Sequence, residues 1–478
     1  MNRRSERGVA LILTLILVLI MSVMAVSLTF IARSETWSSM NYRLMSQARD
    51  GAEAGINRVA NHLMYSYTPP SASGADAYSN YVVTVSPVTS GGNPVVLSSD
   101  GSVSSNYPVS SVQSAFDTAN HGSLAAGTTT VNYAASAKLL SMNEFVKYGG
   151  GNATIQTWEI TSTGRVAGVQ SAEVTVTARL ERQAGPVFTY AAFATFPGCD
   201  ALNFGGGGTT SSYDSFNVAA GVQNYGGNVG TNGSMSTVGN PTTIYGSLST
   251  PRTGVGSCSE ESITAWDPAN GTVTGGLVEL PQAINYPTPD PPDPMPPTTD
   301  YTLNSNNCLN DPPGCVGTTG DYTLSPAYTY GNITLTGTAT LHLTAGTYVI
   351  NSLSLTGNST VVIDSGPVVI NVAGQGETNP INFSGGNITN PSLNPANFQI
   401  LYAGTGEITL RGGTEASGLV YAPNATFSFT GGSHWYGAVI GHFMSDMGGT
   451  AVHYDRRLNS YAKIPGPYTL DSFNWKKY

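Results

Sequence analysis

The stretch VALILTLILVLIMSVMAVSLTFI, residues 9–31, contains no charged side chain. As an α-helix it is about 35 Å long, enough to span the hydrocarbon core of a membrane. The preceding leader, residues 1–8, holds three arginines against one glutamate. By the positive-inside rule, the N-terminus stays in the cytoplasm and the rest of the chain is exported. An ordinary cleaved signal is the alternative, but its apolar region is shorter, about 7–15 residues.

The helical pattern continues beyond the apolar stretch, through residues 32–66. Apolar or small residues recur every three or four positions, at Trp37, Met40, Leu44, Ala48, Ala52, Ile56, Val59 and Leu63. This spacing places them on one face of a helix. The sequence therefore predicts one unbroken helix from about Val9 to about Tyr65, ending before Pro69.

Two motifs in this N-terminal region carry a family resemblance. They are Arg7-Gly8 ahead of the apolar stretch and QARDGAEAGI at residues 47–56. With them the chain resembles type IV pilins, and more closely the minor pilins of the PilX type. The resemblance implies an inner-membrane protein that crosses the membrane once and later joins a periplasmic or surface pilus. Its implied partners are other major and minor pilins and the pilus assembly platform.

The same resemblance assigns roles to single positions. It implies that prepilin peptidase cuts between Gly8 and Val9. The fifth residue of mature major pilins is Glu, which neutralises the N-terminus of a neighbouring subunit, whereas the fifth residue here is Leu13. In the family, loss of this Glu accompanies subunits that initiate or cap the fibre. The resemblance also implies filament contacts at Leu13, Glu53 and Gly55.

A compact head is expected from residues 67–185. TWEITSTG at 157–164 and EVTVTARLE at 173–181 alternate apolar and polar side chains, as strands with one buried face do. Gly164 and Gly168 allow a turn between them, so the pair is predicted to form a β-hairpin. A long helix on an antiparallel sheet is the pilin head, although a generic hairpin has the same pattern.

The residues from 186 to 455 change to short Thr, Val, Ile and Leu runs separated by Gly and Asn. GTATLHLTAG at 337–346 aligns with GNSTVVIDSG at 357–366, with matched glycines at both ends, and Val420 and Val439 have a similar spacing. A repeat of about 20 residues predicts a parallel β-solenoid in which each turn stacks on the last. A β-sandwich is the alternative. The expected fold class is therefore α+β, with a long N-terminal helix, a β head and a large, mainly β region.

Two further segments have distinct compositions. YPTPDPPDPMPPTTDY at 286–301 is expected to form a stiff polyproline II insertion on the surface. Its Asp290, Asp293 and Asp300 provide too few ligands for a Ca²⁺ loop, so a solvated acidic linker is favoured. The aromatic and basic residues 456–478 are expected to form a C-terminal cap or tail.

Four cysteines, Cys199, Cys258, Cys308 and Cys315, lie in the exported part of the chain. An even number in an oxidising compartment predicts two disulfides. Three connectivities are possible. Pairing of Cys308 with Cys315 across a short turn is favoured, which leaves Cys199 with Cys258. A metal site is not expected, because no pair has the CxxC spacing.

The charge distribution excludes one class of partner. The chain has 19 Lys and Arg against 29 Asp and Glu, a formal charge of −10. Between residues 183 and 455 the basic side chains are Arg252 and Arg411. Nucleic-acid binding is not expected there, because Lys and Arg must neutralise the phosphates.

No catalytic residue, cofactor or metal ligand is predicted. The chain has no nucleophile elbow, phosphate loop or HExxH motif. His434 and His453 are spaced to stack on adjacent turns, and a structural role is favoured for them. A surface glycan or a tip adhesin is a further possible partner of the β-rich region. Two other functions stay open: a membrane-anchored adhesin that is not assembled into pili, and a polysaccharide-acting enzyme that would depend on Arg252, Arg411 or the C-terminal histidines.

Overall fold

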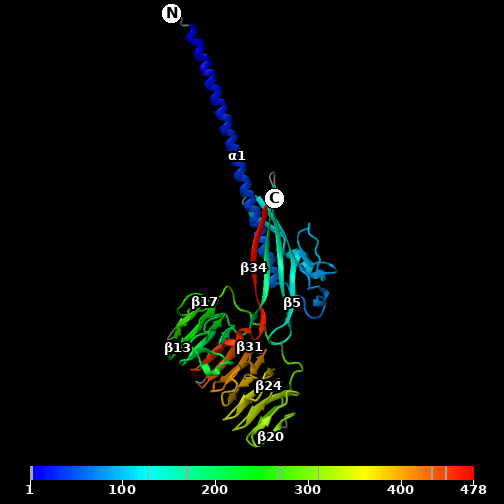
Figure 1. Ribbon diagram of the computed structural model, residues 1–478, viewed down its shortest axis with the longest axis vertical. Helices are drawn as coiled ribbons and strands as arrows, with labels where there is room; N and C mark the ends of the chain where they lie inside the picture. Colours follow the sequence, from blue (N-terminus) through cyan, green and yellow to red (C-terminus); the bar gives the residue numbers. More distant parts are fainter. Residues whose placement is uncertain are drawn as a thin grey trace. The chain divides into compact units, whose positions relative to one another are not determined.

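The computed structural model describes residues 4–126, 129–167, 171–268, 271–309, 312–431, 434–446 and 449–477. They form two compact units, which are described separately (Figure 1). The head unit comprises Met1–Glu144, Thr154–Gln183 and Tyr468–Tyr478. The passenger unit comprises Phe145–Ala153 and Ala184–Pro467.

The N-terminal helix α1 is unbroken over Arg4–Tyr65. The predicted long helix is therefore confirmed, and it begins earlier, within the leader. Its buried side chains follow the predicted face from Leu44 onward, at Leu44, Ala48, Ala52, Ile56, Val59 and Leu63. Trp37 and Met40 continue the same spacing but are exposed, so the buried face is shorter than the pattern.

An antiparallel sheet packs against the second half of α1. Its strands follow the order β3 (Val96–Ser98), β5 (Thr129–Val146), β6 (Asn152–Val166), β7 (Ala172–Pro186) and β34 (Lys463–Lys477), with β4 (Gly122–Ala126) on β5. The smaller elements of the head are η1 (Tyr78–Asn80), β1 (Thr89–Ser90), β2 (Asn93–Pro94) and α2 (Ser110–Ala119). The predicted hairpin is β6–β7, in which Trp158 lies opposite Leu180 and Ile160 opposite Ala178. These four side chains are buried, as the alternation predicts.

The C-terminal segment differs from its prediction. Residues 463–477 form β34, which pairs with β7 at the edge of the head sheet and does not cap the β-rich region. The larger segment of the passenger is thus an insertion between β7 and β34, two neighbouring strands of the head. The sequence suggested a cap because the tail follows the β-rich region directly, and pairing between strands so distant in sequence leaves no local pattern.

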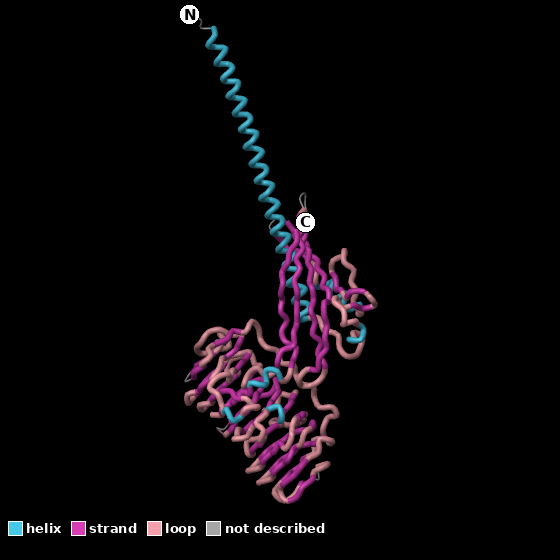
Figure 2. Tube along the Cα trace, viewed as in Figure 1, coloured by secondary structure: helices cyan, strands magenta, loops and turns pink. Residues whose placement is uncertain are grey.

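The passenger is a parallel β-solenoid, as predicted, and not a sandwich. Figure 2 shows it as strands and loops with only short helical turns. Strands on one face pair in parallel in the order β17 (Leu277–Glu279), β14 (Leu248–Thr250), β11 (Val229–Thr231), β8 (Ala192–Ala194), β32 (His434–Asp446), β31 (Ser417–Thr430), β29 (Phe398–Tyr402), β26 (Val368–Val372), β24 (Gly346–Leu355) and β22 (Thr329–Leu335).

Two more faces complete each turn. The second contains β15 (Trp266–Pro268), β12 (Met235–Val238), β9 (Leu202–Gly205), parts of β32 and β31, β30 (Ile408–Arg411), β27 (Ile381–Asn382), parts of β24 and β22, and β18 (Asp300–Leu303). The third contains β16 (Gly271–Val273), β13 (Thr242–Ile244), β10 (Thr209–Tyr213), β33 (Ala451–Asp455), β28 (Asn387–Thr389), β25 (Thr360–Ile363), β23 (Thr340–Leu343) and β21 (Asp321–Thr323). Two antiparallel hairpins close the far end, through β19 (Cys308–Leu309) on β18 and β20 (Val316–Thr318) on β21. Short helical turns are η2 (Val218–Ala220), η3 (Pro395–Asn397) and η4 (Arg456–Ser460).

The predicted repeat is confirmed by the strand register. Thr340 pairs with Thr360, and Val420 pairs with Val439, so residues one repeat apart lie side by side on adjacent turns. The matched Gly337 and Gly357 have φ of 66° and 72°, a backbone conformation that favours glycine at the corner between strands.

The turns do not stack in sequence order. The chain enters the solenoid at β8, which lies between β11 on one side and β32 on the other. It winds outward through β11, β14 and β17, crosses over, and winds back from β18 to β32. The passenger therefore has a first arm, residues 192–279, which contains β13 and β17 in Figure 1, and a second arm, residues 300–446, which contains β20, β24 and β31. The strand pairings join the two arms at β8.

One column of apolar side chains runs through both arms. Register pairs link Tyr348, Ile370, Ile400, Val420, Val439, Ala192, Val229, Leu248 and Leu277. All are buried except Leu277 in β17, the outermost strand of the first arm. The two arms consequently share one hydrophobic core.

The proline-rich segment connects the two arms as a strap, residues 280–299. Its buried residues include Tyr286, Pro289 and Pro292. Their spacing of three matches the periodicity of polyproline II, so one edge of the strap faces the solenoid. The predicted insertion thus packs against the solenoid along one edge. It also links the end of the first arm to the start of the second, which permits the turns to stack out of sequence order.

Side chains of both arms hold the strap. Asn232 of the first arm exchanges two hydrogen bonds with the backbone of Ile284, at 2.8 and 2.9 Å. In the second arm, the Tyr421 hydroxyl donates to the carbonyl of Pro287 (2.5 Å). A third contact comes from outside the arms, where Lys147 of the segment Phe145–Ala153 forms an ion pair with Asp290 of the strap (3.4 Å).

Candidate functional site

The first half of α1 presents a continuous apolar surface. All residues from 9 to 31 are exposed, and α1 is long and apolar enough to cross a membrane. The hydroxyls of Thr14, Ser22 and Thr29 donate to carbonyls of their own helix, at 2.8–2.9 Å. Such internal pairing is what an apolar environment requires of polar side chains. This surface therefore suits a bilayer or the apolar interior of a helical filament.

The predicted processing and filament positions lie on or next to this surface. Gly8 lies within α1, followed directly by the exposed Val9. Leu13 is 62% exposed and carries no charge that could pair with a neighbour's N-terminus. Cleavage after Gly8 and filament contact through Leu13 stay predictions.

The second half of α1 approaches the head sheet unusually closely. A methyl group added at Gly164 of β6 would meet the carbonyl oxygen of Ala48 and the backbone nitrogen of Ala52. On the helix, Gly51 lies against Val131, and Gly55 lies against Ser162. Glycine at these positions lets helix and sheet backbones come together.

This packing bears on two other predicted filament residues. Gly55 is buried inside the head, so its contacts in this structure are with the sheet and not with a free surface. Glu53 lies at the surface and forms an ion pair with Arg49 one turn earlier (2.7 Å). A filament contact through Glu53 stays a prediction.

The N-terminal residues 7–57 match the family model described as PilX N-terminal. The N-terminal segment is therefore type IV pilin-like. A second match covers residues 300–461 and is described as a domain of unknown function, DUF7305. It begins at β18 and ends just after η4, so it coincides with the second arm and the exit from the solenoid.

Similarity over the whole chain is weak. The competence-associated pilin ComZ from Thermus thermophilus aligns with 91% of this chain and 98% of its own, at 13% identity and a TM-score of 0.25. That score does not establish a shared fold. No curated protein matches the sequence.

In the passenger, one of the two predicted disulfides is confirmed. Cys199 and Cys258 are bonded and close a loop of the first arm, with a sequence separation of 59. Cys315 is also disulfide-bonded. The Cys308 side chain, its expected partner, lies outside the described residues.

The basic residues considered for a polysaccharide-acting enzyme are not brought together. Arg252 belongs to the first arm and donates to the carbonyls of Pro197 (2.7 Å) and Asn232 (3.3 Å). Arg411 ends β30 in the second arm and reaches the carbonyl of Ser384 (3.5 Å). Among the described residues, no group of three or more His, Cys, Asp or Glu could hold a metal ion.

The two C-terminal histidines do stack, as their spacing predicts. The rings of His434 and His453 are 5.0 Å apart and inclined by 22°, with a 2.7 Å hydrogen bond between His434 Nδ1 and His453 Nε2. His453 Nδ1 is 2.6 Å from the hydroxyl oxygen of Ser211. Burial, and to a lesser extent His434, lowers the pKa of His453 from 6.5 to about 4. His453 is therefore a neutral, hydrogen-bonded part of the solenoid at neutral pH.

This lowered pKa predicts acid sensitivity of the passenger. The folded pKa of His453 lies below the unfolded value of 6.5, so its contribution to stability is complete above pH 6.5 and is lost as the pH falls toward 4. At about 1.4 kcal/mol per pH unit, the loss is on the order of 3 kcal/mol. We expect the urea midpoint of wild type to fall over this range, and that of His453→Gln to fall less. Equal slopes for the two proteins would contradict this assignment.

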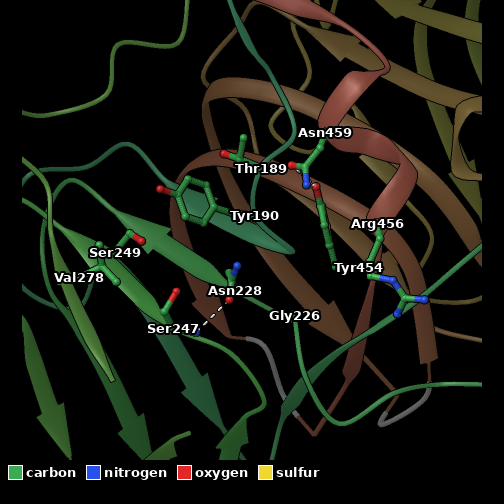
Figure 3. Close-up of a pocket in the computed structure, with 10 residues that line it drawn as sticks. All are labelled: Thr189, Tyr190, Gly226, Asn228, Ser247, Ser249, Val278, Tyr454, Arg456 and Asn459. Carbon is green, nitrogen blue, oxygen red and sulfur yellow. Dashed lines mark hydrogen bonds between the residues drawn. The ribbon is translucent and has the colours of Figure 1, made fainter. Parts of the chain in front are cut away.

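A groove of about 440 Å³ lies where the chain enters and leaves the passenger (Figure 3). We call it the entry–exit groove and define it by Tyr190, Asn228, Ser249, Tyr454, Arg456 and Asn459. Tyr190 belongs to the entering segment, Asn228 and Ser249 to the first arm, and the last three to the exit around η4. Sequence reasoning missed this groove, because it assigned residues 456–478 to the tail and gave Tyr190 no role.

Proposed function

We propose that this chain is a minor pilin of a type IV pilus-like system. In this proposal, residues 9–31 insert in the inner membrane with the N-terminus in the cytoplasm. Prepilin peptidase then cleaves after Gly8, and the chain joins the fibre with other pilins. The observation that carries the proposal is the single helix α1, whose exposed apolar half continues without a break into a half packed on the head.

Two features favour a place at the tip or as a priming subunit. Leu13 replaces the Glu that a shaft subunit offers to the N-terminus of its neighbour. The passenger comprises Phe145–Ala153 and Ala184–Pro467, more than half of the chain, and a fibre end has room for such an insertion. Its role there would be to display the solenoid to a surface, a glycan or another tip protein. We assign it no catalytic step, since Arg252 and Arg411 lie in different arms.

A membrane-anchored adhesin that never enters a fibre is the second candidate. It is favoured by the same Leu13, because a helix without the Glu has lost one contact that recruits subunits into a filament.

Processing separates the pilin proposal from a simple anchor. We expect the protein to migrate faster in cells with prepilin peptidase than in cells without it, by the mass of residues 1–8. Gly8→Val should give the slower form in both strains, because the bulkier side chain prevents close approach of the protease. Gly101→Ala is the matched control, since Gly101 is exposed in the head with free space around it. Identical mobility of wild type in the two strains would overturn the proposal.

A further inference from the structure

The entry–exit groove contains a cation without a direct carboxylate partner. Arg456 Nη1 donates to the hydroxyl of Ser212 (3.1 Å), and its guanidinium carbon lies 5.4 Å from the Tyr225 ring centroid. Among the described residues, Arg456 has no carboxylate within ion-pair distance. Its neighbour Arg457 is instead held by both carboxylate oxygens of Asp214, at 2.8 and 2.9 Å. Arg456 therefore retains donors for an external carboxylate, which a guanidinium binds in a two-pronged geometry.

Opposite Arg456, the groove has an aromatic wall. The Tyr190 ring is half-buried and packs on Phe193, with centroids 5.2 Å apart. A methyl group added at Gly230 would lie 3.2 Å from the same ring, so Tyr190 also rests on β11. Figure 3 shows Tyr190 on one side of the groove and Tyr454 and Arg456 on the other. A half-buried aromatic ring that lines a groove can pack on the apolar face of a sugar ring.

Neutral polar groups also line the groove. The Asn228 side-chain oxygen accepts from the backbone nitrogen of Ser247 (3.0 Å), which orients its amide group toward the groove (Figure 3). The Asn459 side-chain oxygen lies 3.0 Å from the Tyr454 hydroxyl, which also donates to the carbonyl of Phe188 (2.7 Å). Fixed amides and hydroxyls of this kind bind sugar hydroxyls directionally.

From these groups we propose that the entry–exit groove binds a saccharide unit carrying one carboxylate. Arg456 binds the carboxylate, Tyr190 covers the ring, and Asn228 and Asn459 bind hydroxyls. The volume of about 440 Å³ lies within the roughly 300–1,000 Å³ of small-molecule sites. A densely charged polyanion is disfavoured, because Asp and Glu outnumber Lys and Arg in the surrounding passenger.

This inference deepens the proposed display function, but its test does not require a fibre. The full chain, purified in detergent, is titrated with methyl glucuronide and methyl galacturonide and with their neutral counterparts, methyl glucoside and methyl galactoside. Binding is followed by ligand-observed NMR. We expect at least one uronide to bind about tenfold or more tightly than its neutral counterpart, because two charge-assisted hydrogen bonds are stronger than neutral ones.

Variants identify the groups responsible. Arg456→Gln should remove the preference for the acid and leave the weak binding of the neutral sugar unchanged. Tyr190→Ala should weaken both. Arg457→Gln, at the neighbouring arginine outside the groove, is the matched control and should bind like wild type. If Arg456→Gln does not fold, Arg456→Lys keeps the charge without the two-pronged geometry and should weaken uronide binding.

Three results would overturn the proposal. They are absence of uronide binding, equal effects of Arg456→Gln and Arg457→Gln, and inorganic phosphate displacing the uronide while Tyr190→Ala has no effect. The last would show an anion site without sugar recognition. Each can occur whether or not the chain enters a fibre, so failure here leaves the proposed pilin role intact.

Discussion

Replacing Gly164 by alanine is expected to lower the free energy of unfolding of the head by roughly 3 kcal/mol or more, the upper range for overpacked sites. The new methyl group would meet the carbonyl oxygen of Ala48 and, at 2.6 Å, the backbone nitrogen of Ala52. Backbone atoms cannot rotate away as a side-chain tip can. The helix must move off the sheet, which exposes Ala48, Ala52 and Ile56 of its buried face.

Urea denaturation, monitored by hydrogen exchange of individual peptides, would measure the loss of stability in the head separately from the passenger. Exchange should rise in β6 and in the second half of α1, while the passenger stays protected. Gly101→Ala is the matched control, because nothing lies within 4 Å of the added group. Equal stability of the two variants would show that the close helix–sheet contact is not required.

Replacing Phe193 by alanine is expected to destabilise the passenger by about 3–5 kcal/mol, as for a buried Phe whose space stays empty. Phe193 lies in β8, opposite Gly230 of the first arm and Ile440 of the second. Its ring also contacts Tyr286 of the strap, with centroids 4.9 Å apart. Gly230 has no side chain that could fill the space left by the Phe193 ring. The packing is therefore lost at the place where both arms and the strap meet.

Exchange should therefore increase in β11, in β32 and in the strap together. Phe216→Ala is the control, since Phe216 is 76% exposed and contacts Arg457 by a cation–π interaction worth about 0.5–1 kcal/mol. Increased exchange confined to β8 and β11, with β32 unchanged, would contradict the meeting of the arms at β8.

The elements that sequence predicts correctly are those with a local cause. The spacing of Leu44, Ala48 and Ala52 reflects the periodicity of a single helix. The alternation around Trp158 reflects a single hairpin. Gly337 and Gly357 occupy equivalent positions in two consecutive turns. Their spacing therefore indicates a solenoid. All three signals lie within short segments of the chain.

The order of the turns and the groove depend on distant pairings. Val439 pairs with Ala192, although the two residues are far apart in the sequence. The apolar pattern around each of them is the same as in turns that follow one another along the chain. The sequence repeat therefore does not reveal the order in which the turns stack. For the same reason it does not predict that Arg456 and Tyr190 line one groove. The tail is similar, because the alternation in β34 does not reveal that its partner is β7.

The most direct test of the proposed function is mass spectrometry of filaments sheared from cells and purified. We expect peptides of this chain to be present in the filament fraction and its N-terminal peptide to begin at Val9. Absence of the chain from the filaments, with the protein retained in the membrane fraction and still beginning at residue 1, would contradict the proposed function.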